Sequence, residues 1–177
     1  MNDFITINDV FTNDEIDVLM DYWYQIEIKH HIEINLWNTL SEFKTKIQCH
    51  SRNVEIVGIP LDTIPFLTKK INQSFSNVLI GDFGLEGPHY FTKYPTGGFH
   101  SEHKDSGVVN GVLRNKVVSI QLTDGDSYIG GDLIINGKVA SRNKGSVIIY
   151  NGSDKHEVTP VTNGVRFSIT ECAGDKK

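Results

Sequence analysis

The sequence predicts a mainly β fold of the α+β class, with two helices packed on one face of an antiparallel β core. Amphipathic helical patterns occupy the first third of the chain, on either side of a single strand-like run. From His89 onward the chain instead shows short β-like runs separated by clusters of Gly, Asn and Asp. Several short strands with turn residues at this spacing are typical of an antiparallel sandwich or jelly roll.

The first helix is expected just after Thr12. Residues 12–15 (TNDE) form a capping box, in which the first and last side chains satisfy each other's backbone N–H groups. Ile16, Leu19, Met20 and Trp23 then recur at helical spacing. These residues predict one apolar face that packs against the rest of the protein.

A strand and a second helix complete the first third. Residues 53–59 (NVEIVGI) are typical of a strand, and Pro65 suits the first turn of a helix that begins at about Ile64. The apolar face of this helix is made by Ile64, Leu67, Ile71, Phe75 and Val78. We interpret both helical faces as core and not as partner-binding stripes, because an amphipathic helix usually covers a sheet.

The β part of the chain contains six short runs: HYFTKY, KVVSIQLT, GDLIING, GSVIIYN, HEVTPV and VRFSIT. The Asn163-Gly164 pair is a hairpin turn signal, so we expect the last two runs to form one hairpin. Residues 106–115 (SGVVNGVLRN) contain glycine and moderately apolar residues. They fit equally a lid over a site and a plain connecting loop.

The composition excludes several classes of protein. The chain has 177 residues, 38% hydrophobic and 22% charged, which is ordinary for one soluble globular domain. Its net charge of −5 argues against nucleic acid or an acidic membrane surface as partner. Two distant cysteines, Cys49 and Cys172, exclude a disulfide scaffold and a zinc ribbon. Without a signal-peptide pattern or an apolar run near the roughly 18 residues of a membrane helix, we expect a cytoplasmic protein.

The stretch YPTGGFHSEHKD, residues 94–105, raises the question of a metal site. Residues two apart in a strand point to the same face, so His103 and Asp105 can present an imidazole and a carboxylate to one ion. This pair alone is a weak signal. His156, which follows the run GSVIIYN, is the favoured third ligand. Two histidines and one carboxylate form the facial triad of non-haem Fe(II) oxygenases.

Arg166 strengthens the metal hypothesis. It lies ten positions after His156, on the expected returning strand of the same hairpin, between Val165 and Phe167. A guanidinium in such apolar surroundings is costly to bury without a partner. A carboxylate ligand bound through two hydrogen bonds would supply that partner.

Taken together, these residues resemble the prolyl 4-hydroxylase-type branch of the Fe(II)/2-oxoglutarate dioxygenases. The matching motifs are Tyr94-x-x-Gly97-Gly98-x4-His103-x-Asp105, Tyr128-x-Gly130-Gly131-Asp132-Leu133, Lys144-Gly145 and His156-x-Val158-x-Pro160-Val161-Thr162-x-Gly164-x-Arg166-x-Ser168. They cover roughly residues 85–172 in the order and spacing of the family. The resemblance implies a double-stranded β-helix, a distorted jelly roll. It also implies a single domain over residues 1–177, with helical support over 1–85 and a catalytic β core over 86–172.

The resemblance implies a role for each site residue. Fe(II) would be bound by His103, Asp105 and His156. Arg166 would pair with the distal carboxylate of 2-oxoglutarate, and the Tyr94 hydroxyl would help to hold this cosubstrate. Ser168 shares a strand face with Arg166 and would add a hydrogen bond. The cofactors implied are Fe(II), 2-oxoglutarate and O2, with ascorbate as a further candidate.

The reaction implied is hydroxylation of an unactivated C–H bond, foremost in a prolyl residue of a peptide or protein, with release of succinate and CO2. Two alternatives stay open: a hydroxylase of another amino acid or small molecule, and a non-oxidative metal-binding module of cupin type. A DNA-repair demethylase is disfavoured, because such enzymes carry a second arginine where this chain has Cys172, and because the chain lacks a basic footprint. We expect a peptide, protein or small-molecule substrate and neither nucleic acid nor membrane as partner; no oligomeric state is predicted.

Four further residues have open roles. Tyr90 and Thr92 alternate in phase with Tyr94, so we expect them to line the pocket, although Tyr90 also fits a core position. His100 stands where relatives often have an aromatic residue, and we expect it at the mouth of the site or in solvent. Arg52 precedes a strand, and the sequence leaves the direction of its side chain open.

Overall fold

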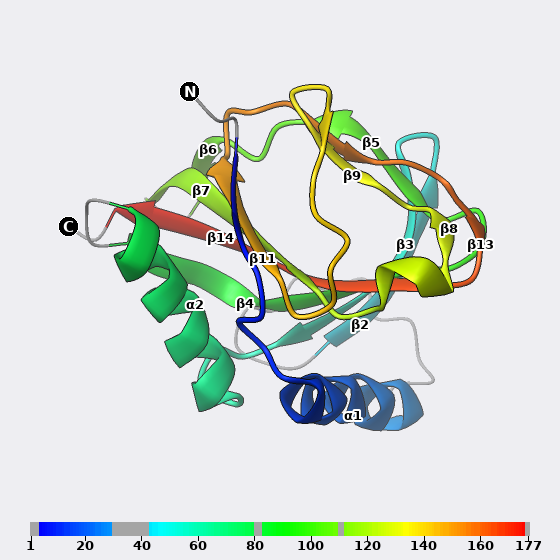
Figure 1. Ribbon diagram of the computed structural model, residues 1–177, viewed down its shortest axis with the longest axis horizontal. Helices are drawn as coiled ribbons and strands as arrows, with labels where there is room; N and C mark the ends of the chain where they lie inside the picture. Colours follow the sequence, from blue (N-terminus) through cyan, green and yellow to red (C-terminus); the bar gives the residue numbers. More distant parts are fainter. Residues whose placement is uncertain (1–3, 30–42, 80–82, 110–111, 176–177) are drawn as a thin grey trace.

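The computed structural model describes residues 4–29, 43–79, 83–109 and 112–175 (Figure 1). In chain order the elements are β1 (Phe4–Ile7), α1 (Asn13–Lys29), β2 (Phe43–Cys49), β3 (Arg52–Ile59), α2 (Pro65–Val78), β4 (Phe83–Tyr94), β5 (Phe99–His103), β6 (Gly107–Val109), β7 (Val112–Gln121), the 3-10 turn η1 (Gly125–Ser127), β8 (Ile129–Gly130), β9 (Leu133–Ile135), β10 (Lys138–Val139), β11 (Val147–Asn151), β12 (His156–Val158), β13 (Val161–Asn163) and β14 (Arg166–Asp175). The described residues therefore form a mainly β fold with two α-helices, as predicted. Neither helix is long and apolar enough to span a membrane.

One large antiparallel sheet dominates the fold. Its main path runs β1-β11-β7-β14-β4-β3-β5-β12-β9-β10, with β2 paired to β3 and β6 paired to β7. A second, two-stranded sheet pairs β13 with β8. The large sheet curls on itself, so that β5 and β9 lie across the molecule from β4 and β14, while α1 and α2 lie outside the curl (Figure 1). This curled antiparallel sheet confirms the jelly-roll prediction.

Both helices begin where the sequence predicts. The Thr12 N–H donates to the Glu15 carboxylate at 2.9 Å, and the Glu15 N–H donates to the Thr12 hydroxyl at 3.3 Å, which completes the capping box ahead of α1. Pro65 is the first residue of α2. The apolar faces of both helices are buried against the sheet, and the Trp23 ring meets Phe167 of β14 edge-on, with ring centroids 5.4 Å apart.

The alternation of side chains along β14 separates two buried layers. Phe167, Ile169 and Ala173 face the helices and belong to, or pack against, the outer hydrophobic core. Ser168, Thr170 and Cys172 line a cavity on the opposite face. A strand has this property because successive side chains point to opposite faces. The helices therefore stabilise the outside of the sheet, and the inside is left for the site.

The expected hairpin between His156 and Arg166 is wrong. β12, which begins at His156, pairs with β5 and β9, whereas β14, which begins at Arg166, pairs with β4 and β7. Between them β13 pairs with β8 in the small sheet. Pro160 separates β12 from β13 and has no N–H for a ladder, which ends the first run before the next begins. Residues Gly107–Val109 and the start of β7, expected as a loop, pair with each other as strands.

A polar pair is buried between α2 and the sheet. The Nδ1 atom of His89 contacts Oε1 of Glu171, and both side chains are fully buried. The other ring nitrogen of His89 lies 3.1 Å from the hydroxyl of Thr68, which donates to the Leu61 carbonyl at 2.7 Å. Because that hydroxyl already donates, it accepts from His89 Nε2–H, and His89 Nδ1 faces Glu171. Burial raises the pKa of Glu171 to about 7, although the hydrogen bond with His89 acts in the opposite direction.

Candidate metal centre and cosubstrate pocket

The motif around Gly97 and Gly98 turns the chain from β4 into β5. Gly97 has φ = 80°, a left-handed conformation that favours glycine. The Gly98 N–H donates to the Pro95 carbonyl at 2.6 Å, and a Cβ on Gly98 would lie only 2.7 Å from the same oxygen. The tight turn needs these glycines, and it brings the chain from Tyr94 back to His103 at the end of β5.

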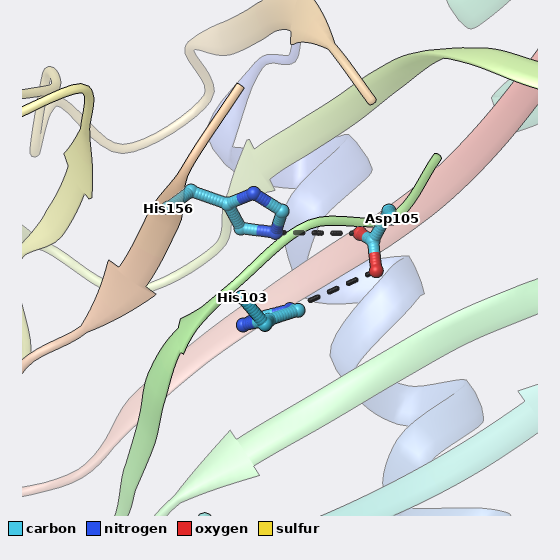
Figure 2. A group of neighbouring side chains, drawn as sticks. All are labelled: His103, Asp105 and His156. Carbon is cyan, nitrogen blue, oxygen red and sulfur yellow. Dashed lines mark ion pairs between the residues drawn. The ribbon is translucent and has the colours of Figure 1, made fainter. Parts of the chain in front are cut away.

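The three predicted metal ligands lie together. His156 opens β12 and is the cross-strand partner of His103, the last residue of β5. Asp105 follows two residues later, and the Nε2 atoms of His103 and His156 lie 3.7 Å and 3.3 Å from its carboxylate oxygens (Figure 2). One ligand atom from each residue lies within 4.8 Å of the other two. Two adjacent strands place the two imidazoles, and the segment after β5 places the carboxylate, around a common point.

Backbone carbonyls orient both imidazoles. Nδ1 of His103 donates to the Ser101 carbonyl at 2.7 Å, and Nδ1 of His156 donates to the Asp154 carbonyl at 3.1 Å. Since a carbonyl only accepts, each ring carries its proton on Nδ1 and turns Nε2 toward Asp105. Metal-binding histidines are typically held in this way, by a hydrogen bond from the nitrogen that does not ligate.

The electrostatics of the three groups suit a divalent cation. Burial lowers the pKa of His103, while its hydrogen bond to the Ser101 carbonyl works the other way. Burial alone would raise the pKa of Asp105, but contact with His156 and the charges of the neighbouring histidines hold it below its ordinary value. The low pKa of Asp105 favours a charged carboxylate and the low pKa of His103 favours a neutral imidazole, which are the forms that bind a metal.

Arg166 is buried without a complete set of partners. Its side chain is 1% exposed, and Nη1 donates to the Ser168 hydroxyl at 3.2 Å. The guanidinium carbon lies 5.1 Å from the centre of the Tyr94 ring. Nη2 is buried and has no hydrogen-bond partner among the described residues. A buried charged donor without an acceptor is costly, so this atom fits a site for an anionic ligand.

A single cavity of about 800 Å³ joins the triad to Arg166. Its volume falls within the roughly 300–1,000 Å³ of small-molecule sites. Tyr94, Ser168, Tyr90 and Thr92 line it as predicted from their strand phase. Two histidines and a carboxylate that face open space are the donor set of non-haem Fe(II) oxygenases. The residues present therefore fit both an Fe(II) ion and a dicarboxylate cosubstrate.

Of three further cavity residues, sequence reasoning missed Tyr150, expected His100 at the mouth or in solvent, and left Arg52 undecided. Tyr150 is 4% exposed, and its ring meets His156 edge-on with centroids 4.9 Å apart. Its place in a run of apolar residues gave no sign of this contact. His100, expected at the mouth or in solvent, is half-buried and stacks on His103 with centroids 3.8 Å apart. Arg52, whose direction the sequence left open, lines the cavity.

Comparison with known proteins agrees with the site. The family model described as the 2OG-Fe(II) oxygenase superfamily matches residues 89–172. A PKHD-type hydroxylase of Rippkaea orientalis is 28% identical over 178 residues, covering 93% of this chain and 75% of that protein. A PKHD-type hydroxylase of Teredinibacter turnerae is 36% identical over 92 residues, covering 46% of this chain and 40% of that protein. The chain thus aligns with less than half of the second relative.

Solved structures share the fold. A Pseudomonas putida prolyl-4-hydroxylase superposes with a TM-score of 0.68 at 18% identity, covering 100% of this chain and 95% of that one. A prolyl hydroxylase from Trichoplax adhaerens, solved with a hypoxia inducible factor peptide fragment, gives a TM-score of 0.73 at 18% identity, covering 99% and 84%. The curled sheet is therefore the double-stranded β-helix that the sequence motifs implied. The family match, the relatives and the shared fold together support a 2OG-Fe(II) oxygenase of the prolyl 4-hydroxylase-like branch.

Proposed function

We propose that this protein hydroxylates an unactivated C–H bond of a prolyl residue in a peptide or protein, while 2-oxoglutarate is converted to succinate and CO2. One oxygen atom of O2 enters the C–H bond and the other enters succinate, so the atoms balance without a further reductant. The observation that carries the proposal is the single cavity that holds both the triad and the incompletely partnered guanidinium of Arg166. The prolyl substrate is favoured by the named activities of the structural neighbours.

Each residue of the site has a role in this proposal. His103, Asp105 and His156 hold Fe(II), and Arg166 binds the distal carboxylate of 2-oxoglutarate through the donor that the chain leaves free. When bound, Fe(II), 2-oxoglutarate and dioxygen together supply the oxidising power for the hydroxylation. We assign residues 86–172 as the catalytic β core and residues 1–85 as its support, in one domain.

The protein's own task is orientation and the exclusion of water. The Ser101 and Asp154 carbonyls fix the direction of the imidazoles, and Tyr150 packs against His156. Ser168 holds one end of the Arg166 guanidinium, and the Tyr94 ring lies beside it. The Tyr94 hydroxyl, whose pKa is raised by burial, remains a neutral hydrogen-bond donor at physiological pH. These contacts preorganise the pocket before ligands arrive, which reduces the cost of ordering it.

Mass spectrometry on a proline-containing peptide library tests the proposal. The protein is incubated with Fe(II), 2-oxoglutarate and air, and the expected result is a 16 Da gain on a proline together with an equal amount of succinate. Omission of either Fe(II) or 2-oxoglutarate should abolish the gain. A gain on another residue, or on a free amino acid, would replace the prolyl assignment with another hydroxylase. Metal binding without succinate formation would favour the cupin-type module.

A further inference from the structure

Arg52 is a cavity residue that the proposed reaction leaves unused. It is the first residue of β3 and the cross-strand partner of His100 on β5. Three residues further along β5 lies His103, so the guanidinium is carried by the strand next to the metal ligands. Arg52 is half-buried and lines the same cavity as the triad and Arg166. It stands beside the site and not within the outer core.

The guanidinium of Arg52 lies at the cavity wall, on the strand that pairs with β5. His100, the cross-strand partner of Arg52, stacks on His103 with ring centroids 3.8 Å apart. Burial raises the pKa of Tyr94, and the charges of Arg166 and Arg52 act in the opposite direction. Within the described ranges, no carboxylate forms an ion pair with Arg52. Among the described residues, Arg52 is thus a cation at the cavity wall without a carboxylate partner.

The charges that line the cavity are unbalanced. The arginines among its described lining residues are Arg52, Arg114 and Arg166, whereas Asp105 is the only carboxylate. Asp105 faces the two imidazoles, and Arg114 is hydrogen-bonded to Tyr90. Arg166 is taken by 2-oxoglutarate in the proposed function. Arg52 is then the cation that remains for a second anionic group in the same cavity.

An apolar surface lies next to Arg52. Val158 is the cross-strand partner of both His100 and Leu133. Val158 and Leu133 are apolar and line the cavity, together with Val54, which lies two residues after Arg52. A ligand with a compact apolar part and an anionic group would therefore satisfy both features. The planar guanidinium matches a carboxylate through two parallel hydrogen bonds. A single arginine in a chain of net charge −5 suits one carboxylate better than a multiply charged phosphate.

We propose that Arg52 binds a carboxylate of the substrate, so that the substrate is an acidic peptide whose apolar residue lies against Val158 and Leu133. This inference rests on the proposed function, because it names the substrate class of the same site. The carboxylate comes either from an acidic side chain near the reacting residue or from a free C-terminus. Both sources present the same chemistry to the guanidinium.

Matched peptides separate these sources and test the inference. Proline-containing peptides are made with Glu or Gln at each flanking position, each with an amidated and a free C-terminus. The wild-type protein should hydroxylate and bind the carboxylate-bearing member of a pair about 10-fold better, as expected for a charge-assisted hydrogen bond that is partly exposed. Preference for Glu in amidated peptides indicates a side chain, and preference for the free terminus indicates a terminal carboxylate.

Variants of Arg52 should remove or reverse the preference. Arg52→Gln should bind both members of a pair alike, and Arg52→Glu should prefer a peptide with Lys at the position of Glu. Lys46→Gln is the matched control, since it removes one exposed charge from the neighbouring strand β2, outside the cavity lining. Lys46→Gln should keep the wild-type preference, which separates a contact with Arg52 from an effect of net charge.

Binding and turnover are measured separately, so that two failures can be told apart. Fluorescence anisotropy of labelled peptides needs no turnover, and the 16 Da gain reports the reaction. A Glu preference in binding that is lost in Arg52→Gln, without any mass gain, would overturn the proposed reaction and uphold the role of Arg52. Equal binding of both members of every pair by the wild type would overturn the role of Arg52. The role of Arg52 would also be overturned if Arg52→Gln raised the 2-oxoglutarate requirement and kept the peptide preference. That result would mean that Arg52 binds the cosubstrate.

Discussion

The two faces of β14 bury polar groups in opposite ways. On the outer face, Glu171 contacts His89, which in turn contacts Thr68, so side chains of this protein supply most of the partners. On the inner face, Arg166 has one hydrogen bond to Ser168 and a buried nitrogen without a partner among the described residues. Oε2 of Glu171 also lacks a hydrogen-bond partner among the described residues, but Glu171 does not line the cavity, whereas Arg166 and Ser168 do. This difference distinguishes a polar cluster that serves stability from one that awaits a ligand.

The largest effect is expected from a substitution of Asp105, which lines the cavity on the inner side of the sheet. Asp105→Ala removes one of three candidate ligands and the only anionic one. Fe(II) binding should weaken by at least about 100-fold, because the loss of even an outer hydrogen-bond partner of a ligand typically costs 10- to 100-fold. Anaerobic Fe(II) titration and succinate formation from 2-oxoglutarate without peptide measure the effect, and both should fall together.

Glu102→Ala is the control for this prediction. Glu102 is an exposed carboxylate on β5 whose partner is the exposed Lys155, so its loss removes the same kind of group next to the site without touching the cavity. It should retain Fe(II) binding and succinate formation. Circular dichroism should show that both variants are folded. Succinate formation that persists in folded Asp105→Ala would show that the carboxylate does not hold the metal.

Arg166→Ala should have the next largest effect. Loss of a buried charge-assisted pair costs about 2–5 kcal/mol, which is roughly a 30-fold to several-thousand-fold increase in the 2-oxoglutarate concentration required. Fe(II) binding should be nearly intact, because the triad is unaltered. The measurement is succinate formation as a function of 2-oxoglutarate concentration, together with anaerobic Fe(II) titration.

Arg142→Ala gives the matched comparison. Arg142 donates to the carbonyls of Gly125, Tyr128 and Gly130 and to Asp132 at 2.6–3.2 Å, so the chain itself satisfies this guanidinium. Its loss should lower the melting temperature and leave the 2-oxoglutarate requirement unchanged. If Arg142→Ala raised that requirement as much as Arg166→Ala does, a missing hydrogen-bond partner on the guanidinium would not explain cosubstrate binding.

On the outer face, Glu171 should make stability depend on pH. Its pKa is raised to about 7 in the folded protein, mainly by burial, from an ordinary value of 4.5. The folded state therefore binds more protons than the unfolded state between these values. The stabilising contribution is fully present below about pH 4.5 and is lost as pH rises through about 7, and it amounts to at most about 3 kcal/mol.

Glu171→Gln should flatten this pH dependence, because an amide does not titrate. Urea unfolding of the iron-free wild type and variant at several values between pH 4.5 and 8 measures it, and the difference between the two curves reports the coupled His89 and Glu171 pair. Succinate formation should change little, because the pair lies behind the cavity wall. Parallel curves for the two proteins would show that Glu171 stays ionised in the core, stabilised by His89.

The sequence predicts local features of this fold well, and it predicts non-local ones only where a family motif carries them. The capping box before α1 and the phase of Tyr90, Thr92 and Tyr94 follow from residues close together in the chain. The contact of His89 with Glu171 joins positions 82 residues apart, and neither flanking sequence signals it. Sheet register decides such contacts, and register is set by the whole hydrophobic pattern.

The expected hairpin between His156 and Arg166 shows the same limit. The Asn163-Gly164 turn was a sound local signal, yet β12 and β14 pair with different strands. The close position of the metal ligands follows instead from the β5–β12 ladder, which no turn residue encodes. The spacing of the family motifs indicates which residues lie together, because the motifs reflect the strand pairing that the family shares. Arg52 and Tyr150 stand outside the motif, and no comparable pattern marks them in the sequence.

The smallest expected effect is that of Ser168→Ala, which tests whether the Arg166 guanidinium is held in place by its own neighbours. Ser168 accepts the hydrogen bond of Arg166 Nη1 at 3.2 Å, and both residues are 1% exposed. Removing the hydroxyl costs about 0.5–1.5 kcal/mol for one hydrogen bond, so the 2-oxoglutarate requirement should rise about 2- to 10-fold. Ser74→Ala provides the outer control, because its buried hydroxyl donates only to the Lys70 carbonyl within α2 and should not affect the cosubstrate. The Arg166→Ala background gives the decisive comparison: if Ser168 acts by positioning the guanidinium, Ser168→Ala should add nothing there. A further rise in the 2-oxoglutarate requirement in that background would mean that Ser168 contacts 2-oxoglutarate directly. The cavity would then bind the cosubstrate through two independent residues.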